Sequence, residues 1–131
     1  MNYKKRRDEV LSKMEKNSVL VLYSGVGHHV SADEYAPFEA NRNFFYLTGI
    51  RRENMMLILD NANEEPTETL LIEEADPDRE RWMGKKMTVD EAKAQAQIEK
   101  VGFIDTEKSV LNRIMTREDV YTVYFDTYRH D

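Results

Sequence analysis

The sequence contains no cysteine. A chain without thiols forms neither disulfide bonds nor cysteine-ligated zinc sites, and it offers no thiolate nucleophile. Long apolar runs are missing too: the longest, such as Val19 to Tyr23, span about five residues, whereas a membrane-spanning helix needs roughly 20. The basic N-terminal residues are not followed by an apolar segment, so no secretory signal is visible. These absences predict a cytoplasmic protein without membrane contacts.

Basic residues are fewer than acidic residues. The chain has 19 lysines and arginines against 25 aspartates and glutamates, a net charge of −6. A domain with this balance has no electrostatic attraction to nucleic-acid phosphates, so nucleic acid is not an expected partner. With 131 residues, 40% of them hydrophobic, and no linker-like stretch, the chain is expected to form one domain, residues 1–131.

The first half reads as one helix and several strands. A helix is expected where apolar residues recur at helical spacing, from Tyr3 to Lys16, ending at Asn17. Continuous apolar or aromatic runs predict an interior strand at Val19–Tyr23, a short extended segment at Asn43–Gly49, and two strands at Met55–Leu59 and Thr69–Ile72. The polar stretch between the last two contains turn-forming residues, which predicts a hairpin.

The second half alternates helices and strands. Asp76-Pro77 is a helix start, and that helix is expected to end near Gly84. Thr88 and Glu91 form a capping box for a helix through about Lys100. Further elements are expected at these positions: a strand at 101–104, a helix carrying Val110, Leu111, Ile114 and Met115, and a strand at 120–125. This order is typical of a parallel crossover, so the fold class is α/β with a mixed sheet flanked by helices.

No catalytic or metal-binding constellation stands out. His28 and His29 are adjacent in the sequence, so on an extended segment their rings point to opposite sides. Gly25 and Gly27 follow a strand but lack the remaining residues of a phosphate-binding loop. Acidic residues cluster in turns and at helix starts, as solvated surface requires. We therefore predict no catalytic residue and no metal ligand in this chain.

Trp82 is the exception among the surface-like segments. It is the only tryptophan and lies among charged residues, including Arg81 and Lys85. One interpretation is a tryptophan packed beneath a loop. The other is an exposed aromatic anchor for a partner or substrate, since tryptophan and arginine are enriched at binding hot spots.

Two motifs carry a resemblance to a known family. Asn41 to Gly49 reads Asn-Arg-Asn-Phe-Phe-Tyr-Leu-Thr-Gly, and Trp82 to Lys86 reads Trp-Met-Gly-Lys-Lys. With Ser31 to Tyr35 and the Arg6-Arg7 pair, this pattern resembles the N-terminal domain of aminopeptidase P, in the creatinase/prolidase superfamily. The resemblance covers essentially the whole chain.

The resemblance implies a ribonuclease-H-like mixed-sheet domain that precedes a C-terminal "pita-bread" metallopeptidase domain. In the family that second domain holds two metal ions, usually manganese, and releases the N-terminal residue that precedes proline. No position here matches the family's metal ligands, so no cofactor is expected in this chain and the chain alone is expected to be inactive. Because it ends at Asp131, either an excised domain or a naturally truncated relative is expected.

By the same resemblance, the domain helps build a homo-oligomer, dimer or tetramer, and shapes the substrate entrance beside its own C-terminal catalytic domain. The residues expected to do so, as entrance wall or subunit contact, are Arg42, Arg81, Trp82, Gly84 and Lys85. Two other functions stay open: the N-terminal domain of a prolidase- or creatinase-type enzyme, and a freestanding module of the same fold that binds peptides or proteins.

Overall fold

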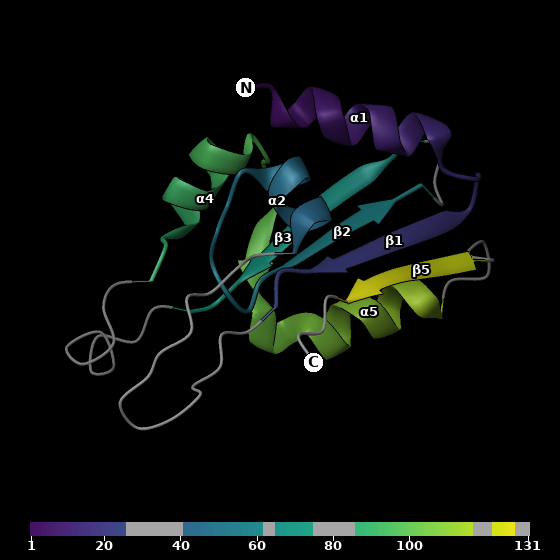
Figure 1. The fold of residues 1–131 in the computed structure, drawn as a ribbon. Coiled ribbons are helices and arrows are strands. Elements are labelled where there is room, and N and C mark those ends of the chain that lie inside the picture. Colours follow the sequence, from purple (N-terminus) through teal and green to yellow (C-terminus); the bar gives the residue numbers. More distant parts are fainter. Residues whose placement is uncertain (26–40, 62–64, 75–85, 117–121, 128–131) are drawn as a thin grey trace.

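The chain folds around a five-stranded sheet in the order β4-β3-β2-β1-β5 (Figure 1). The computed structural model describes residues 1–25, 41–61, 65–74, 86–116 and 122–127. The strands are β1 (Ser18–Tyr23), β2 (Met56–Asp60), β3 (Thr67–Ile72), β4 (Val101–Phe103) and β5 (Thr122–Thr127). The helices are α1 (Tyr3–Lys13), α2 (Arg42–Thr48), α4 (Val89–Ala96) and α5 (Glu107–Met115), with a 3-10 turn, η1 (Ile104–Thr106), before α5.

The sheet is mixed, as predicted. β2 pairs antiparallel with β1 and with β3, so the hairpin expected from the polar turn is confirmed. β4 pairs parallel with β3, and β5 pairs parallel with β1. α4 lies on the connection between the neighbouring parallel strands β3 and β4, because parallel strands cannot be joined by a tight turn. α5 lies on the connection from β4, at one edge of the sheet, to β5, at the other edge beside β1. The mixed α/β fold class is confirmed.

Helices cover the two faces of the sheet unequally. Figure 1 shows α1, α2 and α4 on one face and α5 on the other. β1 contributes to both faces because successive side chains on a strand point to opposite sides. Leu22 belongs to the core beneath α1, α2 and α4, whereas Val19 and Val21 belong to the smaller core beneath α5. β1 is therefore the interior strand that its unbroken apolar run predicted.

The segment Asn43–Gly49, expected to be extended, is instead the helix α2. Asn41 caps its start by accepting hydrogen bonds from the backbone N–H groups of Asn43 and Phe44. Gly49 ends it with a left-handed backbone, φ +71°, which glycine adopts without steric cost. Phe44, Leu47 and Thr48 form the buried side of the helix. The capping residues, not the aromatic content, decide the conformation.

Two other helices are shorter than predicted. α1 ends at Lys13, because Met14 is already extended, rather than at Asn17. The capping box of α4 is confirmed: Thr88 and Glu91 exchange side-chain and backbone hydrogen bonds. α4 stops at Ala96 because Gln97 turns left-handed, φ +57°. The helix expected between Asp76 and Gly84 lies outside the described residues.

A fully buried arginine joins the helices of the larger layer. Arg7, on α1, donates to the carbonyl oxygens of Leu47 (2.8 Å), Ala96 (2.6 Å) and Gln97 (2.6 Å), and its Nε donates to a Glu68 carboxylate oxygen (2.9 Å). Leu47 lies in the last turn of α2, and the other two carbonyls lie at the end of α4. Helix C-termini carry partial negative charge and unpaired carbonyls, so one guanidinium satisfies both helix ends.

Candidate functional site

The segments that carry the motif residues begin and end near one edge of the sheet. β1 and β3 run in the same direction because each is antiparallel to β2. Their carboxyl ends therefore lie at the same edge. Residues 24–25 follow β1 and precede segment 26–40, while residues 73–74 follow β3 and precede segment 75–85, which contains Trp82. We call this the carboxyl edge.

Backbone hydrogen bonds fix the carboxyl edge on the β1 side. Ser24 exchanges two hydrogen bonds with Met55: its N–H donates to the Met55 carbonyl (2.8 Å), and its Oγ accepts from the Met55 N–H (2.9 Å). The Asn54 N–H donates to the Gly25 carbonyl (2.7 Å), and the Asn41 N–H donates to the Ser24 carbonyl (3.0 Å). The two ends of segment 26–40 are thus held beside each other.

An ion pair marks the β3 side of the carboxyl edge. Lys86 Nζ lies 3.1 Å from Glu73 Oε1, and both side chains are 24% exposed. Lys86 is the last residue of the tryptophan motif, and Met87 after it is buried in the core. A partly buried surface pair of this kind contributes about 1 kcal/mol. The pair holds residue 86 next to Glu73, the first residue after β3.

Tyr23, the last residue of β1, lies at the same edge, and the charges there shift its pKa. Burial raises the pKa of its hydroxyl, and the carboxylates of Glu107, Glu73 and Glu53 raise it further. The protonated hydroxyl donates a hydrogen bond to Asn54 Oδ1 (2.9 Å). Three carboxylates acting on one phenol indicate negative potential around the end of β1.

Of the five residues expected at the substrate entrance or subunit contact, the structure describes only Arg42. It is the first residue of α2 and is exposed, one position after the Asn41 cap. Arg81, Trp82, Gly84 and Lys85 lie outside the described residues, as do His28 and His29, so their roles stay predictions. Within the described ranges, no three acidic or histidine side chains are grouped so as to hold a metal ion. No helix in the described part is long and apolar enough to cross a bilayer.

The Arg6-Arg7 pair contacts the Asn41–Gly49 motif, and these contacts stabilise the fold. The Arg6 guanidinium lies over the Tyr46 ring, 4.2 Å from its centre, and donates to the Tyr46 carbonyl (2.9 Å). Arg7 donates to the Leu47 carbonyl. A side chain at Gly49 would collide with the Tyr3 ring. The Arg-Arg pair and the Tyr-Leu-Thr-Gly motif are therefore two halves of one contact between α1 and α2, which sequence order alone did not reveal.

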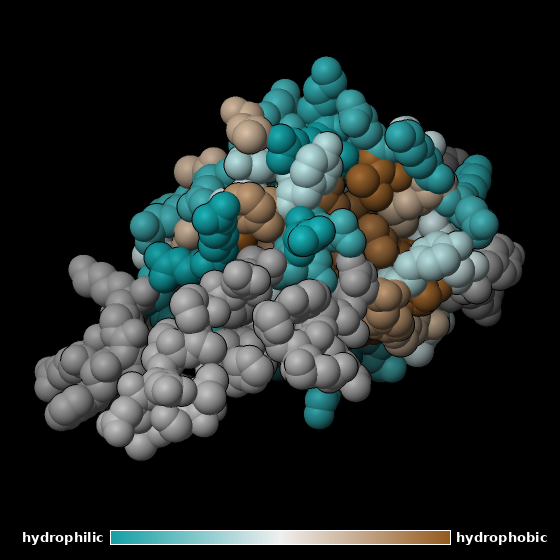
Figure 2. All heavy atoms as spheres, viewed as in Figure 1, coloured by the Kyte–Doolittle hydropathy of each residue, from teal (hydrophilic) through white to brown (hydrophobic). Residues whose placement is uncertain are grey.

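The described residues also form several hollows. An apolar groove between α1, α2 and β1 has a volume of about 320 Å³ and is lined by Val10, Leu20, Leu22, Asn43, Tyr46 and Leu47. Figure 2 shows hydrophobic side chains gathered on this side of the molecule, below α1. Tyr46 is 51% exposed, and Tyr124, the β5 residue paired with Leu20, is 42% exposed. A surface of this kind is typical of an interface.

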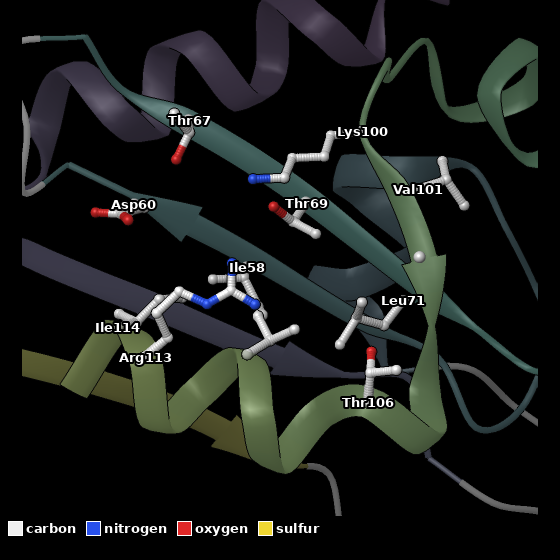
Figure 3. Close-up of a pocket in the computed structure, with 12 residues that line it drawn as sticks. Ile58, Asp60, Thr67, Thr69, Leu71, Lys100, Val101, Thr106, Arg113 and Ile114 are labelled. Atoms are coloured by element: carbon white, nitrogen blue, oxygen red, sulfur yellow. The ribbon is translucent and has the colours of Figure 1, made fainter. Parts of the chain in front are cut away.

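A second hollow, here called the α5 cavity, lies between α5 and the opposite face of the sheet (Figure 3). Its volume is about 360 Å³. Its walls come from β2, β3, the start of β4, η1 and α5. Sequence reasoning singled out none of its polar residues, because they are ordinary threonines and surface cations that only the fold brings together.

Comparison with known proteins now identifies the family. The sequence profile of the family described as "Aminopeptidase P, N-terminal domain" matches residues 3–124. The chain belongs to this family. Among curated relatives, a Xaa-Pro aminopeptidase from Haemophilus influenzae is 28% identical over 86% of this chain and 26% of its own length. The intermediate cleaving peptidase 55 of Schizosaccharomyces pombe is 29% identical over 86% of the chain and 24% of its own length.

Solved structures show the same aminopeptidase P domain. A Bacillus anthracis protein assigned as an aminopeptidase P superposes with a TM-score of 0.89 at 32% identity, over 98% of this chain and 31% of that one. Escherichia coli aminopeptidase P with the inhibitor Pro-Leu superposes with a TM-score of 0.83 at 20% identity, over 94% and 28%, which shows a shared fold. The chain thus spans about a quarter to a third of the length of these relatives.

Proposed function

We propose that this chain is the non-catalytic N-terminal domain of a Xaa-Pro aminopeptidase, which releases an N-terminal residue that precedes proline. The observation that carries the proposal is the family match over residues 3–124, joined to relatives whose remaining length lies outside the matched region. The described residues build a sheet, two cores and an interface-like groove, which suits a domain that positions other parts of an enzyme.

The proposed enzyme uses two manganese ions held by its separate catalytic domain. Such a metal pair supplies a hydroxide nucleophile at neutral pH and polarises the scissile carbonyl. The described residues do not fit a role as ligands to those ions, so no step of the chemistry is assigned to them. Their contribution is mechanical: the domain positions surfaces against the catalytic part and against neighbouring subunits.

The apolar groove supports the assembly role. Val10 and Leu20 line it and are only half-buried, and the buried Leu22 lies beside them. Covering apolar surface of this kind stabilises an interface by about 25 cal/mol per Å². We propose that a second subunit covers it, giving a dimer or tetramer, or that the catalytic domain of the same chain covers it.

The segment with Arg81, Trp82, Gly84 and Lys85 is proposed to form a wall of the substrate entrance, together with Arg42. Support comes from the residues that flank it: the ion pair holds residues 73 and 86 together, so the intervening segment begins and ends at one place on the carboxyl edge. A tryptophan ring there offers a flat apolar surface for a proline ring or for the side chain that precedes it.

The test uses the intact gene product, assayed with manganese on a series of Xaa-Pro peptides. We expect Trp82→Ala to raise KM or lower kcat at least tenfold, or to change the oligomeric state measured by light scattering. Met115→Ala, which truncates an exposed apolar side chain on α5 (44% exposed), is the control and should change neither. Unchanged kinetics and assembly in Trp82→Ala would remove the entrance role. Cleavage restricted to dipeptides would favour a prolidase-type parent instead.

A further inference from the structure

The α5 cavity combines an apolar floor with cationic walls. Ile58 and Leu71, each 1% exposed, form its floor from β2 and β3. Val110 and Ile114 face them from α5 and are only half-buried. Binding pockets for small molecules have the same composition, largely hydrophobic with a few polar groups that fix orientation, and about 360 Å³ is at the lower end of their usual size.

Two cations reach into this cavity from opposite sides. Lys100 comes from the residue before β4, and Arg113 comes from the last turn of α5. Figure 3 shows their charged groups extending toward each other, with Thr69 between them. Across the described residues, neither side chain makes a hydrogen bond or an ion pair. Both residues are exposed, so solvent screens their mutual repulsion, and an anion bound between them would gain charge-assisted hydrogen bonds from both.

A single buried carboxylate limits what the cavity accepts. Asp60, at the end of β2, lines the cavity and is 4% exposed. Asp60 already has an interaction partner, and its carboxylate would still repel a second anionic group placed beside it. The hydroxyls of Thr67 and Thr69 can donate to carboxylate oxygens without adding charge, whereas the Thr106 hydroxyl already donates to the Phe103 carbonyl (2.6 Å).

We propose that the α5 cavity binds a small organic monocarboxylate with a short aliphatic body. The carboxylate lies between Lys100 and Arg113, and the aliphatic body rests on Ile58 and Leu71. This site is on the face of the sheet opposite α1, α2 and α4, away from the apolar groove. It does not depend on the proposed peptidase function.

The experiment is an NMR titration of the 131-residue chain with 4-methylpentanoate, following amide shifts of Val101 and Gly102. We expect saturable shifts confined to residues around the cavity. 4-Methylpentanol, which keeps the aliphatic body but has no charge, should bind more than fivefold more weakly, and so should glutarate, which carries a second carboxylate. No saturable shift, or equal binding of the alcohol or glutarate, overturns the proposal.

Charge variants separate the site from general attraction to a cationic surface. Lys100→Gln and Arg113→Gln should each raise the Kd for 4-methylpentanoate about fivefold. This factor is modest because solvent screens both charges. Lys108→Gln removes an exposed charge from the same helix, outside the cavity, and should leave the Kd unchanged. Equal weakening by Lys108→Gln overturns the proposal.

A filling variant tests the location without touching either cation. Val110→Phe places a ring in the cavity, so we expect binding to be lost while the circular dichroism spectrum and melting temperature stay close to those of the parent chain. Ser109→Ala, at an exposed neighbouring position outside the cavity, is the control. Folded Val110→Phe protein that binds with the parent Kd overturns the proposal.

Discussion

Replacing Arg7 by methionine removes the group on which two helix ends and one strand converge. Methionine keeps the unbranched aliphatic stem but offers no donor. The carbonyls of Leu47, Ala96 and Gln97 then lose their partner inside the protein, and Glu68 loses the closer of its two cations. Buried acceptors cannot recover these hydrogen bonds from water without local opening.

The magnitude follows from burial. Removing one partner from a buried, hydrogen-bonded ion pair costs about 3–5 kcal/mol. The Arg7 side chain is 0% exposed and that of Glu68 12%, so we expect a loss of about 4 kcal/mol in the free energy of unfolding. Arg7→Lys keeps the charge but reaches fewer of the four acceptors, and should cost about 2 kcal/mol.

Urea denaturation followed by far-ultraviolet circular dichroism measures both losses. Arg6→Met is the matched control: the neighbouring arginine makes one backbone hydrogen bond and stacks on exposed Tyr46, so its loss should cost about 1 kcal/mol or less. If Arg7→Met does not fold, Arg7→Lys still supplies the comparison. Arg7→Lys no less stable than Arg6→Met would refute the reasoning.

Three further outcomes can be measured on the same chain. Gly49→Ala should lose about 2 kcal/mol, because φ is +71° and the new methyl group meets the Tyr3 ring; an unchanged urea midpoint would contradict this. Thr88→Ala should lose about 1 kcal/mol by removing the α4 cap, and Thr88→Ser should restore most of it. Tyr23 has a raised pKa, so its contribution to stability is complete below pH 10 and is lost as the pH rises through the folded value. Tyr23→Phe should therefore flatten the fall in stability above pH 10 while losing the hydrogen bond to Asn54, and an equally steep fall would count against the assignment.

The strands were predictable because burial on both faces leaves an uninterrupted apolar run. Val19–Tyr23 and Met55–Leu59 coincide with β1 and β2 to within a residue. The hairpin and the α4 capping box were equally local signals. The helix α2 was missed because its aromatic residues suggested a strand, whereas Asn41 and Gly49 at its ends favoured a helix.

What sequence reasoning could not find depends on contacts between distant segments. Arg7 and Ala96 are 89 positions apart, and nothing in the pattern of α1 distinguishes Arg7 from the exposed cations beside it. The α5 cavity likewise joins Lys100 and Arg113 only through the packing of α5 against the sheet. The family resemblance identified the domain, yet several of its matching residues turn out to stabilise the fold.

The central claim is that this domain positions the parts of an enzyme whose catalytic residues lie elsewhere. Measuring the peptidase activity of the isolated chain tests this claim most directly. The purified 131-residue chain, freed of bound metal and then supplied with manganese, is incubated with Xaa-Pro peptides, and release of the N-terminal residue is followed by mass spectrometry. We expect no release above buffer, with the chain folded throughout. Multiple turnovers that disappear on substitution of one residue within the chain would contradict the account.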